Sequence, residues 1–393
     1  MARLLLLYNC KFWLKNCKIR FRECLSPYAK AFFYAPTQCF APQVATFGKK
    51  MEKIKPEDLW QFLDDRVLID VRSPAEYAHA HAPHALSLPL FNDAERAKVG
   101  TIYKQVSPES ALFKGLDFVG PKMSGFIKKA IKWSPSRKVI VHCWRGGKRS
   151  GSMAWLLKFA GFDVLTIAGG YKAYRQYVLQ QFENQGIKAI ILGGKTGSGK
   201  TLILKELEKK GEQIIDLEAL ANHKGSAFGW IGEESQPSSE QFDNNLFDVF
   251  RTLNPQKRVW IENESRSIGA VFIQQGFWNQ MRQAPLIHIE VSFDARVNHL
   301  VEGYTQTSQA DLVASFEKIK KKLGYNHAKS AIECVQKGEY AEAAAMGLKY
   351  YDKAYNFGFE EHSAPEKHIL DVPQFDPFAT AEQLIELADS LKY

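Results

Sequence analysis

Cys143 is the residue of this chain best placed for covalent chemistry. It lies in the stretch His-Cys-Trp-Arg-Gly-Gly-Lys-Arg-Ser, residues 142–150, between a strand-like apolar run and a helix-like run. Glycines let a backbone fold so that several N–H groups face one point, and these groups, a helix start and nearby cations favour a thiolate. Such a thiolate attacks sulfur, selenium or phosphorus, and the donors hold the resulting anion. We expect the loop to supply catalytic Cys143, Arg145 and Arg149 and anion-binding Gly146 and Gly147.

A second loop further along the chain has the composition of a phosphate site. The stretch Gly-Lys-Thr-Gly-Ser-Gly-Lys-Thr, residues 194–201, fits the pattern G-x-x-x-x-G-K-[ST] in full, after an apolar strand and before an amphipathic helix. The backbone of such a loop cradles phosphates, its lysine neutralises charge, and its last hydroxyl holds Mg²⁺. The pattern leaves open whether a nucleotide is the ligand. The residues expected to contact the phosphates are Gly194, Gly197, Gly199, Lys200 and Thr201.

Polar residues follow two further strands of the same region. Glu262 ends a strand-like run at the place where a metal- or water-orienting acid usually sits, with Glu264 as the alternate. Residues 216–229 mix acids, cations, hydroxyls and glycines after another strand, where a loop faces a phosphate site. We expect Glu262, His223 and Ser226 to line the phosphate site, and no metal site made of protein side chains alone.

Strand-like and helix-like runs alternate along most of the chain, which favours parallel sheets wrapped by helices. The fold class is therefore α/β, with two domains in contact, at 55–184 and 187–393. The first domain is expected to have strands at 67–71, 85–90, 138–142 and 164–167 and helices at 92–106 and 109–133. The second is expected to have strands at 188–192, 213–217, 257–262 and 286–291, a helical segment at about 295–357, a strand at about 367–371 and a helix at 379–391.

The first 50 residues differ from the rest in charge and cysteine content. They hold nine basic residues and one acid, so they carry +8 of the net charge of +9, and they hold four of the six cysteines. We expect this leader, 1–50, to precede the real start at Met51, or else to be a basic segment that targets an organelle. The body is nearly neutral, so an RNA or phosphate site must come from local clustering of charge. Its two cysteines form no disulfide framework, which favours a reducing compartment and a cytoplasmic location.

Two known chemistries fit the cysteine loop. Together with Asp70-Val71-Arg72 and Gly169-Gly170-Tyr171, the loop resembles that of a rhodanese domain, in which the cysteine carries a persulfide. The string His-Cys, five residues, Arg-Ser also satisfies the signature of cysteine phosphatases. A phosphatase usually needs a nearby acid to protonate the leaving group, and the loop itself contains none. The signature alone does not decide between these chemistries.

The whole pattern resembles the tRNA 2-selenouridine synthase family, whose members join a rhodanese domain to a P-loop domain. The resemblance covers about residue 60 to the end and leaves out the leader. The order of the motifs matches as well as the single motifs. The segments that carry it are 70–72, 92–105, 142–150, 169–175, 194–201, 216–229, 262–269 and 350–355.

The resemblance implies a rhodanese-like domain followed by a P-loop NTPase-like domain with a helical C-terminal extension. It implies that the C2 sulfur of a wobble 2-thiouridine in tRNA is replaced by selenium from selenophosphate, through an S-geranylated intermediate made with geranyl diphosphate. Cys143 is then the essential cysteine, and the P-loop binds the prenyl diphosphate or a tRNA phosphate, with Mg²⁺ at Thr201. The implied partners are tRNA and an enzyme that supplies selenophosphate, and neither DNA nor a membrane is expected.

Three other interpretations stay open. The chain could be a persulfide sulfurtransferase that acts on tRNA or a protein, a cysteine phosphatase fused to a P-loop kinase, or a non-catalytic nucleotide sensor. The intact cysteine loop and the complete P-loop argue against the sensor. In the family interpretation, the helical segment 295–357 grips tRNA by phosphate contacts and base stacking. Its candidate residues are Lys318, Lys320, Lys321, Lys322, Tyr325, Tyr350, Tyr351 and Tyr355.

Overall fold

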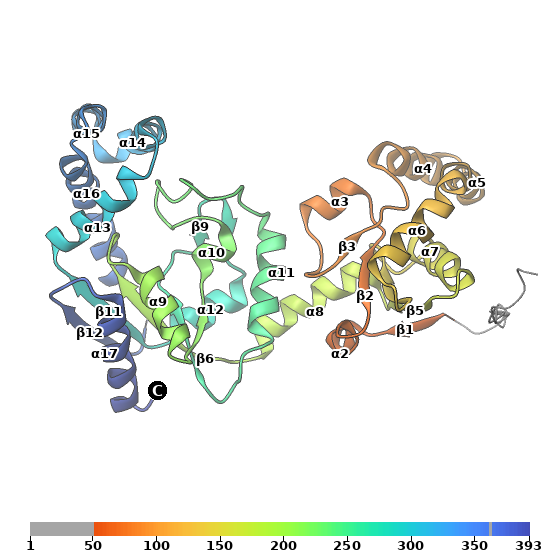
Figure 1. The fold of residues 1–393 in the computed structure, drawn as a ribbon, viewed down its shortest axis with the longest axis horizontal. Helices are drawn as coiled ribbons and strands as arrows, with labels where there is room; N and C mark the ends of the chain where they lie inside the picture. Colours follow the sequence, from red (N-terminus) through yellow and green to blue (C-terminus); the bar gives the residue numbers. More distant parts are fainter. Residues whose placement is uncertain (1–50, 361–363) are drawn as a thin grey trace, which may run out of the picture. The chain divides into compact units, whose positions relative to one another are not determined.

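The computed structural model describes residues 51–360 and 364–393, and the expectations for the leader lie outside this part of the chain. Two all-parallel sheets follow one another along the chain (Figure 1). The predicted α/β fold class is confirmed. Among the described residues, no helix combines the length and apolar character needed to cross a membrane.

The first sheet has five parallel strands in the order β1-β5-β4-β2-β3. Its strands are β1 Glu52–Ile54, β2 Val67–Asp70, β3 Leu86–Ser87, β4 Lys138–His142 and β5 Asp163–Ile167. Its larger helices are α3 Pro74–His79, α4 Asp93–Gln105, α5 Pro108–Val119, α6 Met123–Trp133, α7 Lys148–Phe159 and α8 Gly170–Asn184. Short turns at Pro56–Asp58 and α2 Trp60–Leu63 precede β2.

Three details of this half differ from the expectations. The helix expected at 109–133 is two helices, because Gly120 and Pro121 interrupt it with a single 3-10 turn. The strand expected at 85–90 is regular only at β3, since Pro89 has no N–H to donate to a ladder. The edge strand β1 was missed because three residues give too short a pattern to recognise.

The second sheet also has five parallel strands, in the order β12-β11-β6-β8-β7. Its strands are β6 Lys188–Gly194, β7 Gln213–Ile215, β8 Arg258–Glu262, β11 Leu286–Val291 and β12 Lys367–Val372. Its helices are α9 Lys200–Lys209, α10 Leu217–Ala221, α11 Ser239–Phe250, α12 Gln275–Gln283, α13 Phe293–Thr305, α14 Gln309–Leu323, α15 Tyr325–Lys337, α16 Tyr340–Glu360 and α17 Pro377–Ser390. A small antiparallel hairpin, β9 Ser267–Ile268 with β10 Val271–Phe272, was not expected.

Each anion loop follows the middle strand of its sheet. β4 and β6 are buried along almost their whole length, as expected for central parallel strands covered on both faces. β4 leads to Cys143 and β6 leads to the P-loop. The carboxyl ends of parallel strands are where an open α/β sheet binds ligands, so the fold places both loops where chemistry is expected.

The two halves share one hydrophobic core cluster. Phe182 of α8 packs edge to face against Phe247 and Phe250 of α11 and Phe277 of α12, with ring centroids 5.4–6.1 Å apart. Trp60 joins the same cluster through Phe247, at 5.4 Å. Edge-to-face pairs of this kind add stabilisation to the buried area itself. The domains therefore meet through apolar packing.

Candidate active site

Cys143 lies at the base of a tightly turned loop at the end of β4. Its side chain is 3% exposed, and its Sγ lies 3.2 Å from the hydroxyl of Ser150 in the first turn of α7. The backbone N–H of Tyr171 donates to the carbonyl of Cys143 at 2.9 Å, which fixes the loop from below. Gly146 and Gly170 have φ of +64° and +63°, a region that glycine adopts without strain.

Gly170 has no room for a side chain. A Cβ built there would overlap the carbonyl oxygen of Cys143 and lie 2.5 Å from the N atom of Gly146. A Cβ on Gly146 would lie 2.9 Å from the carbonyl oxygen of Ile167. The cysteine loop and the Gly169-Gly170 turn therefore pack backbone against backbone, and only glycine permits this contact.

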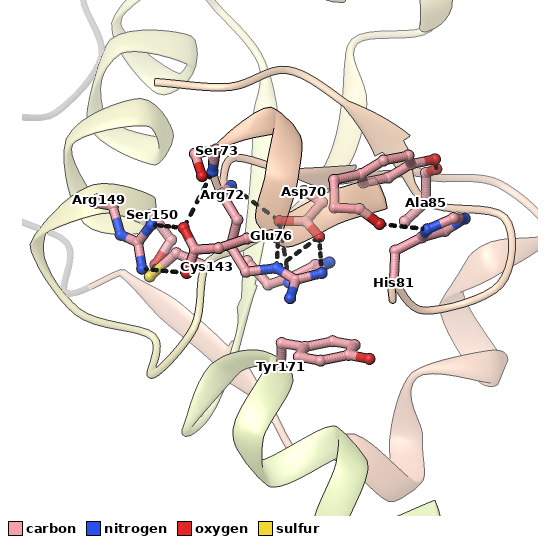
Figure 2. A network of polar contacts seen from close by, with 12 residues as sticks. Asp70, Arg72, Ser73, Glu76, His81, Ala85, Cys143, Arg149, Ser150 and Tyr171 are labelled. Carbon is pink, nitrogen blue, oxygen red and sulfur yellow. Dashed lines mark hydrogen bonds and ion pairs between the residues drawn. The ribbon is translucent and has the colours of Figure 1, made fainter. Parts of the chain in front are cut away.

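A buried polar stack lies beneath the cysteine loop (Figure 2). The guanidinium of Arg72 donates to both carboxylate oxygens of Asp70, at 2.6–3.1 Å, and lies 3.8 Å from the centre of the Tyr171 ring. The pKa of Asp70 is lowered: His142 and Arg72 outweigh the opposing effect of burial. Burial lowers the pKa of His142, against the opposing charge of Asp70. This stack gives the loop a rigid floor.

Arg149 faces a carboxylate instead of an open anion site. Its guanidinium donates to Glu76 at 2.6 and 3.3 Å (Figure 2), and Arg96 lies 3.5 Å from the same carboxylate. Glu76 also closes the capping box of α3 with Ser73. The pKa of Glu76 is lowered, because its hydrogen bonds with Arg149 and the Ser73 backbone outweigh the desolvation that raises it. A phosphatase-type loop needs its arginine for the dianionic phosphate, so this pair weakens the phosphatase interpretation.

The other cations of the loop are on the surface. Arg145 and Lys148 are exposed, and neither forms an ion pair with any residue that the structure describes. Gly147 is also exposed, and a Cβ there would meet open space. The mouth of the loop therefore presents positive charge to an incoming anion.

Hydrogen bonds within the P-loop and between the P-loop and α16 (residues 340–360) hold its conformation. The N–H of Gly194 donates to the hydroxyl of Tyr355 at 2.9 Å, and Lys200 Nζ donates to the carbonyl of Gly194 at 3.0 Å. Ser198 is 1% exposed, and among the described residues its Oγ has no hydrogen-bond partner. A buried hydroxyl without a partner in a phosphate-type loop is suited to a phosphate oxygen.

An aromatic ring lies on the start of α9. Gly199 has φ of +73°, and a Cβ built on it would overlap the ring of Phe375 from the segment after β12. Gly197 has φ of +81° and lies against Arg296 and Leu300 of α13. Glycine at these positions thus serves both the backbone conformation and close packing.

Glu218 lies beside Thr201, and Glu262 and Glu264 both interact with Glu218. The Thr201 hydroxyl donates to Glu218 at 3.0 Å, and Glu262 accepts from the Glu218 N–H at 2.8 Å. Burial and the neighbouring charge of Glu218 raise the pKa of Glu264 to about 8. Burial raises the pKa of Glu262 well above its usual range, and within the described residues its Oε2 has no partner. Glu218 therefore faces Thr201 directly, while Glu262 holds the backbone behind it.

The stretch 223–229 joins this group. A Cβ on Gly225 would lie 2.8 Å from carboxylate oxygens of both Glu218 and Glu264. Ala227 N donates to the hydroxyl of Tyr351 at 3.0 Å, and Ser226 Oγ accepts from Phe228 N at 3.2 Å. Within this stretch it is Gly225 that lies against the carboxylates near Thr201, and a role for His223 and Ser226 at the phosphate site stays a prediction. Burial lowers the pKa of the His223 side chain.

Comparison with known proteins supports the pairing of the two loops. A family described as "Rhodanese-like domain" matches residues 55–177, and one described as "tRNA 2-selenouridine synthase AAA domain" matches 187–368. A tRNA 2-selenouridine synthase of Shewanella denitrificans is 36% identical over 302 residues, covering 73% of this chain and 76% of the relative. One of a Sulfurovum species is 33% identical, covering 77% and 91%. The chain belongs to the tRNA 2-selenouridine synthase family.

In this member of the selenouridine synthase family, residues that the motifs did not single out contact both loops. Arg296 of α13 forms a two-point ion pair with Asp352 of α16, both contacts at 2.7 Å, and donates to the carbonyl of Thr196 at 3.2 Å. Glu218 and Tyr355 were part of the resembling segments, but only the structure shows that they touch the P-loop. Glu76 likewise gains its role from the distant Arg149.

The hydroxyl of Thr201 and the carboxylate of Glu218 are of the chemical type that would suit a divalent cation. The described residues contain no cluster of three or more His, Cys, Asp or Glu side chains that would hold a metal by themselves. The unpartnered Glu262 oxygen and the raised pKa of Glu264 show that their surroundings favour the protonated carboxyls, and a bound divalent cation would favour the ionised form instead. Thr201 and Glu218 would hold Mg²⁺ together with phosphate oxygens, which is the usual way a P-loop binds it.

Proposed function

We propose that this protein is a tRNA 2-selenouridine synthase that works in two steps, one at each anion loop. Membership of the selenouridine synthase family, with an intact Cys143 loop and an intact P-loop in one chain, is the observation that carries the proposal. The substrate is a tRNA with 2-thiouridine at the wobble position. Geranyl diphosphate and selenophosphate are the co-substrates, and both are anions.

In the first step, the C2 sulfur of the base attacks the first carbon of geranyl diphosphate. A carbon–sulfur bond forms, the carbon–oxygen bond breaks, diphosphate leaves, and the base loses its N3 proton. The P-loop N–H groups and Lys200 would hold the departing diphosphate, and Ser198 would donate to one of its oxygens. Mg²⁺ at Thr201 and Glu218 would neutralise charge on the same group.

In the second step, selenium replaces the geranylated sulfur. Selenium bonds to C2, geranyl thiolate leaves and takes a proton, and water cleaves the selenium–phosphorus bond to give phosphate. The turned loop around Cys143, with the exposed Arg145 and Lys148 at its mouth, suits a small selenium-bearing anion. Because Arg149 is tied to Glu76, the loop carries less charge for a phosphate dianion than a phosphatase would offer.

Mass spectrometry of nucleosides tests this function. A 2-thiouridine tRNA is incubated with the full chain, geranyl diphosphate and selenophosphate, and digested. We expect 2-selenouridine from the wild type, S-geranyl-2-thiouridine alone from Cys143→Ala, and unchanged 2-thiouridine from Lys200→Ala. Cys334→Ala is the matched control: Cys334 lies on α15 (residues 325–337), away from both loops in the sequence, and its loss should change no product.

Other outcomes would favour the alternatives. Unchanged tRNA with the wild type refutes the proposal, and release of phosphate from an aryl phosphate would then point to a phosphatase. In a separate incubation with an unthiolated tRNA and thiosulfate, a gain of sulfur by the tRNA would point to a persulfide sulfurtransferase.

A further inference from the structure

α4 and α5 form a helical arm that the rest of the described chain hardly covers. Among the 13 residues of α4, none is buried, and in α5 only Ala111 and Gly115 are. The two helices pack on one another and appear side by side in Figure 1. We call this pair the α4–α5 arm (residues 93–119). The proposed reaction assigns it no role, although residues 92–105 carry part of the family resemblance.

Large apolar and aromatic side chains of the arm face solvent. Tyr103 is 57% exposed, Val106 70%, Phe113 59% and Leu116 56%. Apolar groups gathered on one exposed element usually mark a binding surface. An aromatic ring in this setting is a platform on which an unpaired base can stack.

The charges on α4 are arranged for an anionic partner. Its two acids are engaged: Asp93 accepts from the N–H of Ala75 at 3.1 Å, and Glu95 pairs with Lys122. Lys98 and Lys104 are exposed and form no ion pair with any described residue. The helix therefore offers free positive charge beside its exposed ring, a combination that suits single-stranded RNA.

No contact within the described chain explains why position 100 is a glycine. It lies in the interior of α4, where glycine destabilises a helix relative to alanine, and a Cβ there would meet nothing within 4 Å. On a helix, Arg96, Gly100, Tyr103 and Lys104 share one face. A bare strip of backbone between a cation and an aromatic ring allows a base or a phosphate to approach closely.

The same face begins at the mouth of the cysteine loop. Arg96 lies 3.5 Å from the Glu76 carboxylate that binds Arg149 at 2.6 Å. A single carboxylate thus connects the start of the arm with the loop of Cys143. An RNA segment on the arm would lead its next nucleotide toward Cys143.

We propose that the α4–α5 arm binds the unpaired anticodon loop of the tRNA, with Tyr103 stacked on a base and Arg96 and Lys104 at phosphates. This inference rests on the proposed function, since it takes tRNA as the substrate. It places the RNA surface on the arm, whereas the sequence had favoured the helical segment 295–357. In that segment Lys318 lies 4.1 Å from the centre of the Trp230 ring, and Lys320 pairs with Glu317 at 2.6 Å.

The test measures binding of a labelled 2-thiouridine anticodon stem-loop to the full chain by fluorescence anisotropy. Tyr103→Ala should raise Kd about fivefold to a hundredfold, the usual effect of losing one stacked base. Lys104→Ala should lower the slope of log Kd against log salt by about 0.7. Gly100→Ala should weaken binding at least fivefold and yet raise the thermal midpoint, because alanine favours the helix.

Gly125→Ala is the matched control. Gly125 is also an exposed glycine within a helix of the same domain, with open space at its Cβ. This variant should raise the thermal midpoint and leave Kd unchanged. A loss of affinity that accompanies a gain in stability cannot come from unfolding.

Several results would overturn the inference. If Gly100→Ala and Tyr103→Ala bind the stem-loop with wild-type affinity, the arm does not bind RNA. If only the double variant Lys321→Ala with Lys322→Ala loses affinity, the RNA surface lies on segment 295–357. If light scattering shows that the arm variants change the molar mass and not the affinity, the arm is an interface between two copies. A wild type that binds no stem-loop would refute the proposed function as well as the inference.

Discussion

Replacing Gly170 by alanine should disable the cysteine loop without touching any side chain in it. The new Cβ would overlap the Cys143 carbonyl oxygen and lie 2.5 Å from the N atom of Gly146. An ordinary contact needs about 3.4 Å, so one of the two backbones must move by about 1 Å. Alanine at a φ of +63° adds a further cost of about 1 kcal/mol.

The expected size of the effect follows from this displacement. Overpacking and backbone strain together should cost on the order of 3 kcal/mol, or about 10 °C in thermal midpoint. A displacement of about 1 Å at reacting atoms typically costs about a hundredfold in rate. We therefore expect selenation to fall about a hundredfold at a temperature where the variant is still folded.

Two assays follow the loop directly. The rate of Cys143 alkylation by iodoacetamide in the folded protein reports the thiolate, and nucleoside mass spectrometry reports 2-selenouridine. Gly151→Ala is the control just beyond the loop, since Gly151 lies within α7 and a Cβ there meets nothing within 4 Å. Wild-type rates in Gly170→Ala, or equal losses in both variants, would refute the argument from backbone overlap.

Two further predictions concern the P-loop. Gly199→Ala should weaken pyrophosphate binding more than tenfold in calorimetry, because its Cβ overlaps the ring of Phe375. Adding Phe375→Ala should restore part of the affinity. If the double variant binds no better, the loss comes from the φ of +73° alone. Glu264 has a pKa of about 8 in the folded protein against an ordinary 4.5, so between these values the folded state holds a proton that the unfolded chain lacks. Stability should therefore fall as pH rises from 5 to 8, and Glu264→Gln should flatten the thermal midpoint over that range; an unchanged slope would contradict the raised pKa.

Both anion loops could be predicted from the sequence because their signals are local. An apolar strand, a glycine-rich turn and a helix start lie within a dozen or so residues, and short-range geometry determines them. The choice between carboxylates could not be predicted in this way. Glu262 and Glu264 alternate at the end of β8, yet the acid that touches Thr201 is Glu218 from another strand end.

The braces of the loops come from distant parts of the chain. Tyr355 and Gly194, which share a hydrogen bond, are 161 residues apart in the sequence. Arg149 and Glu76 are 73 residues apart. No periodicity or spacing in the sequence encodes such a contact, because tertiary packing decides it. The sequence of α4 weakly indicates that the helix is exposed. It has no continuous apolar stripe, which a helix packed against a core would need.

The aromatic cluster around Phe182 couples the stability of the two halves of the described chain. Tyr171 extends this connection, since its N–H binds the Cys143 carbonyl while its hydroxyl bonds to Glu240 and Asn244 of α11, each at 2.8 Å. Cutting the chain after α8 would expose these rings to water and leave a buried hydroxyl without partners. Either half expressed alone should therefore be less stable than it is in the full chain, and the thermal midpoints of the two fragments and of the full chain would measure the difference.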